Sequence, residues 1–307
     1  MIAVVGGLGA ALCWAIATMS TSRSSKMIGP SSVLAWVMIV GAVVAFFPAL
    51  LERPDGDLDP TAVTLSVVAG LAYIGGLSLI YRALRIGPVT IAAPVVSTEG
   101  ALAAVIAVFL GEPLGAAAAV LLAIIAVGVI LASSERPSDD RAAEAGRAEE
   151  ADAGTTEALG PGLRTTPEIT RRTAILAFAA AIVFAVGLVT SARAVTLGMP
   201  VMWVSLVARM LGVALVALPL LVTGRLRWAR RALPFVVAAG VGEVVGTALY
   251  TIAAQDGIAI AAVLGAQFAT ISVVGAYLLF GERLDRRQVV GVVIVIVGVA
   301  LLSAVAV

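Results

Sequence analysis

The chain has 307 residues, of which 61% are hydrophobic and only 13% are charged, and its mean hydropathy is +1.10. A soluble protein of this size would carry nearly twice that share of charge, so the composition excludes a soluble globular protein and predicts an integral membrane protein. The net charge of +1 gives no reason to expect a nucleic-acid partner. Histidine is absent and Cys13 is the single cysteine, so we expect no metal site, no cofactor and no enzymatic activity.

Apolar residues form ten runs of about 20 residues, the length at which a helix crosses roughly 30 Å of bilayer hydrocarbon. The first run is followed, not preceded, by basic residues, so we interpret it as a membrane helix and not as a cleaved signal peptide. The sequence therefore predicts an all-α integral membrane protein with ten transmembrane helices. In chain order the runs cover residues 2–20, 33–51, 61–81, 89–110, 114–132, 173–192, 200–223, 233–252, 258–280 and 287–306.

The fifth and sixth runs are separated by a long polar segment, residues 133–171. It is rich in alanine, glycine, proline and charged residues, and it has few residues able to build a hydrophobic core. We predict a disordered, charged linker. It divides the chain into residues 1–132 and residues 172–307, each with five predicted helices.

The two halves repeat one another at an offset of 170 residues. The clearest match is between residues 83–114, which end in FLGEPL, and residues 253–284, which end in LFGERL. Because five is an odd number, the second copy must enter the membrane from the opposite side, which gives two inverted five-helix repeats. Corresponding pairs include Trp14 and Phe184, Tyr73 and Glu243, and Gly76 and Gly246.

The basic residues agree with this inverted arrangement. The loops after the first, third, fifth, seventh and ninth runs hold 17 lysines and arginines, whereas the opposite loops hold 2. Basic loops face the cytoplasm, so the linker is predicted to be cytoplasmic and both termini are predicted to lie outside. The remaining basic residue, Arg209, lies inside the seventh run.

Several motifs resemble the EamA-type, ten-helix members of the drug/metabolite transporter superfamily. They are Trp14, ALRIG at 83–87, STE at 97–99, GEPL at 111–114, Arg209 and GERL at 281–284. The resemblance covers nearly the whole chain except the linker. It implies two five-helix bundles around a central cavity, transport by alternating access, and a multi-pass location in the plasma (inner) membrane of a bacterium. The chain departs from the family pattern at Gly100 and Ala269, and the family is usually described with cytoplasmic termini.

Three ionisable residues lie deep inside predicted helices: Glu99, Arg209 and Glu243. An ionisable side chain at mid-membrane costs about 2.5–3.5 kcal/mol, so each should face a cavity or a partner. We interpret Glu99 as a carboxylate that binds a proton or a cation; the alternative is a carboxylate permanently paired with Arg209 or bonded by neighbouring hydroxyls. We expect Arg209 to pair with Glu99 or Glu243, the alternative being an anionic group of the substrate.

Further residues are candidates for lining a cavity in which we expect few aromatic side chains. Glu243 lies on a helix face of small residues, and Tyr73 occupies the equivalent position in the first half, so both repeats place a polar group there. Trp14 lies deeper than an interfacial tryptophan would, and stacking against the substrate is its proposed role. The remaining candidates, expected to line the cavity near or opposite Glu99, are Ser97, Gln267 and Thr270.

These observations predict a secondary transporter of a small metabolite or drug-like solute. Outward transport is implied by the resemblance, and proton exchange through Glu99 or Glu243 is the favoured energy source. An uncoupled facilitator or a channel-like pore is the alternative. The expected partners are the small-molecule substrate, protons and the lipid bilayer, and the oligomeric state is left open.

Overall fold

The computed structural model describes residues 1–52, 57–86, 95–133, 167–280 and 286–305, and within these ranges the chain forms helices and no strand. The prediction of an all-α protein is therefore confirmed for the described part of the chain. The predicted linker, residues 133–171, lies outside the described residues except at its two ends, which belong to helices.

Each of the ten predicted runs contains helix in its described part. The first half contains α1 (Ile2–Ile28), α2 (Pro30–Leu51), α3 (Pro60–Ile86), α5 (Glu99–Phe109) and α6 (Ala116–Ser133). The second half contains α8 (Pro167–Thr196), α9 (Val201–Gly212), α10 (Leu218–Val222), α11 (Leu233–Ala253), α12 (Ile258–Gly265), α13 (Phe268–Phe280) and α14 (Arg286–Val305). A π-helical segment, η1 (Val213–Ala217), connects α9 to α10, and a 3-10 segment, η2 (Arg230–Ala232), precedes α11.

Six helical spans of the described residues are long and apolar enough to cross a membrane by length and composition. Shorter apolar helices cover Glu99–Phe109, Ala116–Leu131 and Ile258–Ser272. Together these elements indicate a multi-pass membrane protein, although fewer helices than the ten predicted reach full length in the described residues. The six spans are Ile2–Ser25, Pro30–Leu51, Pro60–Ile80, Arg171–Thr196, Val201–Val222 and Arg230–Ala253.

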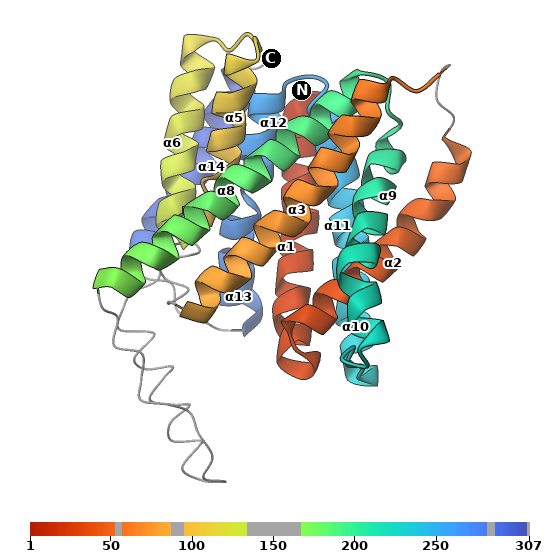
Figure 1. The fold of residues 1–307 in the computed structure, drawn as a ribbon. Helices are drawn as coiled ribbons and strands as arrows, with labels where there is room; N and C mark the ends of the chain where they lie inside the picture. The colour runs from red at the N-terminus through yellow and green to blue at the C-terminus, as the bar shows by residue number, and fades with distance from the viewer. Residues whose placement is uncertain (53–56, 87–94, 134–166, 281–285, 306–307) are drawn as a thin grey trace.

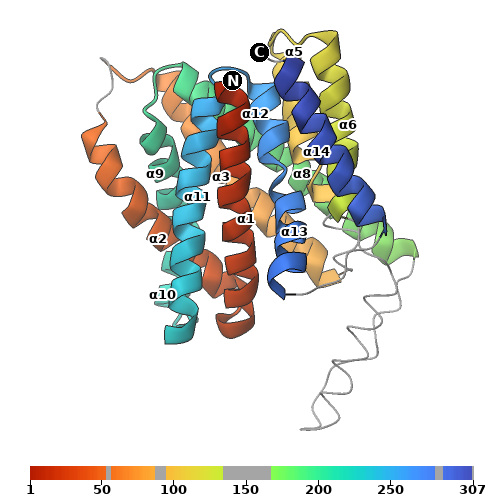
Figure 2. The same ribbon diagram turned by 180° about the vertical axis from the view of Figure 1, so that it is seen from behind.

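The helices of the two halves are interleaved and are not gathered into two separate bundles (Figures 1 and 2). The most extensive helix pairs are α1 with α11, α3 with α8, α6 with α14, α5 with α12 and α2 with α9, and each pair joins the first half to the second. Contacts within a half, such as those between α1 and α2, are less extensive. The largest hydrophobic cluster likewise mixes both halves, with Ala103 and Ile125 from the first and Val189 and Leu264 from the second.

Helices that correspond at the offset of 170 residues run in opposite directions in Figure 1. Helix α1 begins at the top of the view, whereas its counterpart α8 begins at the bottom and rises. The segment that follows α10, which carries four arginines, lies at the bottom, at the end of the molecule opposite the start of α1. The arginine-rich segment and the N-terminus are thus at opposite ends of the bundle.

The helix predicted over residues 258–280 is broken into α12 and α13, and the side chain of Gln267 stabilises the break. The Gln267 backbone N–H donates to the Leu264 carbonyl at 3.1 Å, one residue short of its regular helical partner. The carbonyl of Val263 instead accepts a hydrogen bond from the Gln267 side-chain Nε2 at 3.0 Å. A carbonyl left unpaired in hydrocarbon costs several kcal/mol, so this side chain makes the break tolerable. The prediction of one continuous helix here is wrong, because the apolar pattern continues across the break.

The helix predicted over residues 89–110 shows a similar break in its described part. Residues 95–96 are helical, a turn follows, and α5 begins at Glu99. The Thr98 hydroxyl donates to the Val95 carbonyl at 2.7 Å, and the Thr98 backbone N–H donates to the same oxygen at 3.3 Å. Both halves therefore interrupt their fourth predicted helix and satisfy the exposed backbone with a polar side chain.

Two aromatic rings pack on glycines of the opposite half at equivalent positions. A Cβ atom on Gly246 of α11 would lie 2.7 Å from the ring of Trp14, and one on Gly76 of α3 would lie 2.6 Å from the ring of Phe184. Real Cβ atoms essentially never approach so closely, so both ring positions require glycine. These contacts join α1 to α11 and α8 to α3, the two most extensive pairs.

Replacing Gly246 by alanine should lower the free energy of unfolding by about 1–3 kcal/mol, the usual cost of forcing an extra methyl group into a packed interior. Unfolding of the purified protein in detergent would measure this loss. Gly75→Ala is the matched control, because a Cβ there would meet only Val183 Cγ1 at 3.6 Å, an ordinary contact. Equal losses in the two variants would contradict the packing argument.

Candidate functional site

A cavity of about 330 Å³ lies within the interleaved bundle. Its lining comes from α1, α3, α8, α9, α11, the first residue of α13 and the residues around the start of α5, so both halves contribute. The volume is at the lower end of the range of roughly 300–1,000 Å³ typical of small-molecule sites. Five of the predicted site residues line it: Trp14, Tyr73, Glu99, Arg209 and Glu243.

The Arg209 side chain is only 3% exposed and is held by contacts from several helices. Its Cζ lies 4.9 Å from the centroid of the Tyr73 ring, within the range of a cation–π interaction. Its Nη1 lies 3.8 Å from the sulfur of Met38 on α2. Helix α2 can pass this close because a Cβ on Gly41 would lie 2.9 Å from Arg209 Cδ. Arg209 is therefore fixed in position by α2, α3 and its own helix α9.

Arg209 forms an ion pair with Glu243 of α11. The distance from Nη2 of Arg209 to Oε2 of Glu243 is 3.3 Å, and the Glu243 side chain is 20% exposed. Of the two acidic partners considered for Arg209, the structure places Glu243 in contact. The guanidinium charge is thus balanced within the protein, which argues against its being reserved for an anionic substrate.

Glu99 is the first residue of α5, directly after the helix break, and it lines the cavity. Within the described part of the chain its carboxylate makes no hydrogen bond and no ion pair. The hydroxyl of neighbouring Thr98 is directed to a backbone carbonyl instead. Because Arg209 is balanced by Glu243, the cavity lining carries one carboxylate more than it carries guanidinium groups. The unbalanced carboxylate can be neutralised by a proton or by a cationic ligand.

The lining is rich in aromatic side chains, and the expectation of few aromatic residues is wrong. The chain has four tryptophans, four tyrosines and eight phenylalanines, and five of these rings line this one cavity. The Trp14 ring centroid lies 5.9 Å from that of Tyr250 and 6.4 Å from that of Phe268. The Tyr73 centroid lies 6.3 Å from that of Phe184. The rings come from five different helices, which is why their gathering is not apparent along the sequence.

The other three predicted site residues do not line this cavity. Gln267 is 1% exposed, and its side chain bonds the Val263 carbonyl at the helix break. Thr270 is 4% exposed and lies against Gln267, with its Oγ1 at 3.5 Å from Gln267 Oε1. Ser97 is buried in the turn that precedes α5. All three are close to the breaks, where polar side chains are needed for the backbone.

Two lining residues that the sequence analysis did not propose as site residues had a detectable signal. Phe184 corresponds to Trp14 at the repeat offset, and the structure places both rings in the cavity. Ser205 lies four residues before Arg209 on α9, hence on the same helix face, and its Oγ is buried with no hydrogen-bond partner in the described structure. Repeat equivalence and helical spacing would have identified these two positions.

The helix that carries Arg209 is followed by a segment of π-helix. The π-helical segment η1 begins at Val213, four residues after Arg209, and spans five residues. Such segments are rare in proteins and frequently occur at functional sites. The deviation follows α9, the helix that carries Arg209 and Ser205, about one turn beyond Arg209.

Comparisons with known proteins agree with this architecture. The sequence profile of the EamA-like transporter family matches residues 1–134 and 171–304, once in each half of the chain. The comparison with curated proteins found no match. A solved structure described only as "Crystal structure of protein" superimposes with a TM-score of 0.74 at 20% sequence identity, covering 99% of this chain and 98% of that chain. At this identity the likeness shows the fold alone.

Proposed function

The chain belongs to the EamA-like transporter family, and from this membership and the geometry of its cavity we propose that it is a secondary transporter of a small organic cation. The resemblance noted in the sequence is thereby confirmed at the level of the family. The proposal adds a substrate class, a mechanism and an energy source, each supported by particular residues.

The proposed substrate class is based on the charge balance of the cavity. Glu99 is unpaired within the described residues, while Arg209 is balanced by Glu243 at 3.3 Å. A cationic group next to Glu99 would make the lining neutral, whereas an anionic group would add to the excess negative charge. The five aromatic rings support the same choice, because they attract cations by their faces and also accommodate an apolar body.

Alternating access is the proposed mechanism, with the cavity open in turn to each side of the membrane. The opposite directions of α1 and α8 and the equivalent ring–glycine contacts support two inverted repeats. Because every extensive helix pair joins the two halves, the moving bodies would be groups of helices drawn from both halves. We propose outward transport through the plasma membrane of a bacterium, with the basic loops cytoplasmic and the termini outside.

Proton exchange at Glu99 is the proposed energy source. A single carboxylate that binds either a proton or the cation, but not both, couples the two flows in opposite directions. Glu243 is less suited to this exchange because Arg209 already pairs with it. Uncoupled facilitation is the alternative, and it requires no titrating group.

The test compares ligands that share a phenylethyl group and differ in the polar group and its charge: phenethylamine, phenylalanine and 2-phenylethanol. A ligand that binds the folded state raises the unfolding temperature by mass action, so thermal unfolding of the purified protein reports binding. We expect stabilisation by the amine, less by the zwitterion and least by the alcohol.

A larger shift with phenylalanine or the alcohol than with phenethylamine would contradict the cationic substrate class. If a cation stabilises the protein but crosses reconstituted vesicles at a rate that is independent of a proton gradient, the protein is a facilitator. In that outcome the substrate class stands and the proton-exchange proposal fails.

A further inference from the structure

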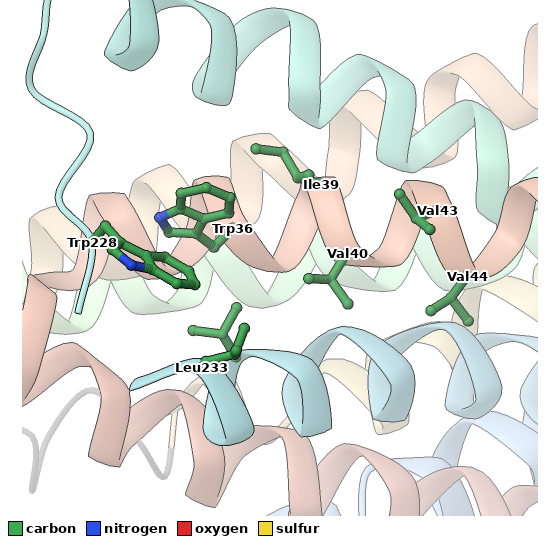
Figure 3. A pocket seen from close by; sticks show the side chains of 8 residues that line it. Trp36, Ile39, Val40, Val43, Val44, Trp228 and Leu233 are labelled. Atoms are coloured by element: carbon green, nitrogen blue, oxygen red, sulfur yellow. The ribbon is translucent and has the colours of Figure 1, made fainter. Parts of the chain in front are cut away.

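An apolar groove on the outer surface of the bundle, separate from the central cavity, runs between α2 and α11 (Figure 3). Its volume is about 510 Å³, and every side chain that lines it is apolar or aromatic. Val43 is 57% exposed and Trp228 is 52% exposed, so the groove is open to the surroundings of the protein. Figure 3 shows the two tryptophans together at one end and the valines of α2 continuing along the groove. A lining of this kind accommodates a hydrocarbon chain.

Two tryptophans mark one end of the groove. The ring centroids of Trp36 and Trp228 are 5.0 Å apart. The Trp36 indole N–H donates to the Arg227 carbonyl at 3.0 Å, and the Arg227 backbone N–H donates to the Ser32 hydroxyl at 3.0 Å. These two bonds attach the segment between α10 and α11 to the start of α2. Paired tryptophans are typical of the depth at which hydrocarbon meets the lipid head groups.

The segment at this end of the groove is strongly basic. Residues 223–232 contain four arginines and no acidic residue. All four side chains are exposed, and in the described part of the chain none of them forms an ion pair. An excess of four positive charges at the polar end of an apolar groove calls for an anionic group there. The arginines are Arg225, Arg227, Arg230 and Arg231.

The start of α11 adds to the positive potential at the same end. Helix α11 begins at Leu233, which itself lines the groove, and Arg230 and Arg231 form the turn directly before it. The aligned peptide dipoles of a helix give its N-terminus a partial positive charge that attracts an anion. At Leu233 and Pro234 this attraction is electrostatic and not a hydrogen bond, because the Leu233 N–H donates to the Arg230 carbonyl and Pro234 has no N–H. The arginines, the helix start and the apolar groove therefore converge on one place.

We propose that this groove binds an anionic phospholipid, with an acyl chain between α2 and α11 and the phosphate at Arg230, Arg231 and the start of α11. Basic pockets between helices on the cytoplasmic side are typical sites for anionic head groups, and the basic loops define that side here. A second copy of the chain is a poor occupant, because a two-fold axis here would bring its own arginines against these. The bound lipid would bridge α2, which packs on Arg209, and α11, which carries Glu243.

The test is native mass spectrometry of the full-length protein in detergent, titrated with phosphatidylglycerol or with phosphatidylcholine of identical acyl chains. The test variant is Arg230→Gln/Arg231→Gln. The matched control is Arg286→Gln/Arg287→Gln, which removes two exposed arginines at the start of α14. We expect phosphatidylglycerol to bind the test variant about 30-fold more weakly than the wild type, since each arginine near an anionic surface contributes about fivefold. The control should bind as the wild type does.

A second variant, Val43→Trp, fills the groove from an exposed position without disturbing the core. It should also weaken phosphatidylglycerol binding while leaving all four arginines in place. Equal binding of the two lipids, an equal loss in both arginine variants, or unchanged binding in Val43→Trp would each overturn the proposal. Competition by glycerol phosphate, which has the head group and no chain, would also overturn it, because the site would then recognise a soluble anion.

Discussion

Replacing Arg209 by methionine is expected to lower the free energy of unfolding by about 3–5 kcal/mol, the usual cost of removing one partner of a buried ion pair. The variant leaves the Glu243 carboxylate, of which only 20% is exposed, without its cation. It also removes the cation from the face of Tyr73, at 4.9 Å. Methionine keeps most of the side-chain volume beside Gly41, so the packing of α2 on α9 changes least. Reversible unfolding in mixed detergent micelles would measure the loss.

The double variant Arg209→Met/Glu243→Gln separates the charge from the packing. Because the charge of Glu243 is removed together with its partner, the double variant should recover most of the stability that the single variant loses. Arg171→Met is the control for loss of an exposed arginine at the start of α8, and it should change stability little. If the double variant is as unstable as Arg209→Met, the ion pair is not the cause and the contacts with Tyr73 and Met38 are.

Replacing Glu99 by glutamine should abolish uptake driven by a proton gradient. It should also weaken binding of phenethylamine, whose ammonium group can donate a hydrogen bond to the carboxylate, about 10- to 150-fold. The expected loss of binding corresponds to about 1.5–3 kcal/mol, the usual contribution of a hydrogen bond to a charged group. Vesicles containing the reconstituted protein are loaded at low pH and diluted into a phenethyltrimethylammonium solution at higher pH. Its charge is permanent, so it cannot enter as a neutral base. The wild type should accumulate the cation, and Glu99→Gln should not.

Two further variants show whether the Glu99 charge is responsible. Glu99→Asp keeps the carboxylate and should retain part of the gradient-driven uptake. Glu112→Gln is the control, because Glu112 is a partly buried glutamate outside the cavity whose Oε1 accepts a hydrogen bond from the Ala259 N–H at 3.0 Å. Glutamine can accept the same bond, so this variant should transport normally. Normal uptake by Glu99→Gln would remove Glu99 from the coupling mechanism.

The helical architecture could be predicted largely from the sequence, but the helix breaks could not. Run length gave the positions of the helices, and the offset of 170 residues gave the repeat, because both are properties of the linear pattern. The break between α12 and α13 leaves no mark on hydropathy, since apolar residues continue on both sides of it. It depends on one side chain, Gln267, which supplies a hydrogen bond to the Val263 carbonyl.

For the candidate site, the sequence identified ionisable residues at membrane depth but not the contacts between them. Glu99, Arg209 and Glu243 could be found because an ionisable residue inside an apolar run needs an explanation. The choice of Glu243 over Glu99 as partner depends on helix packing, because α11, which carries Glu243, lies against α9. A polar residue at membrane depth can serve the cavity or the backbone. Gln267 and Thr270 lie at the break, and the sequence pattern alone does not separate these two uses.

The interleaving of the halves also determines the order in which the protein can assemble. Helices α1 and α3 are synthesised long before α11 and α8, the helices against which they pack most extensively. A chain stopped before α11 has inserted most of its helices, but it lacks the surface that covers α1 and the glycine that receives the Trp14 ring. Such long-range contacts form only after the entropy of closing the intervening chain has been lost. The folded core, including the cavity, is therefore completed late, once the second half has entered the membrane.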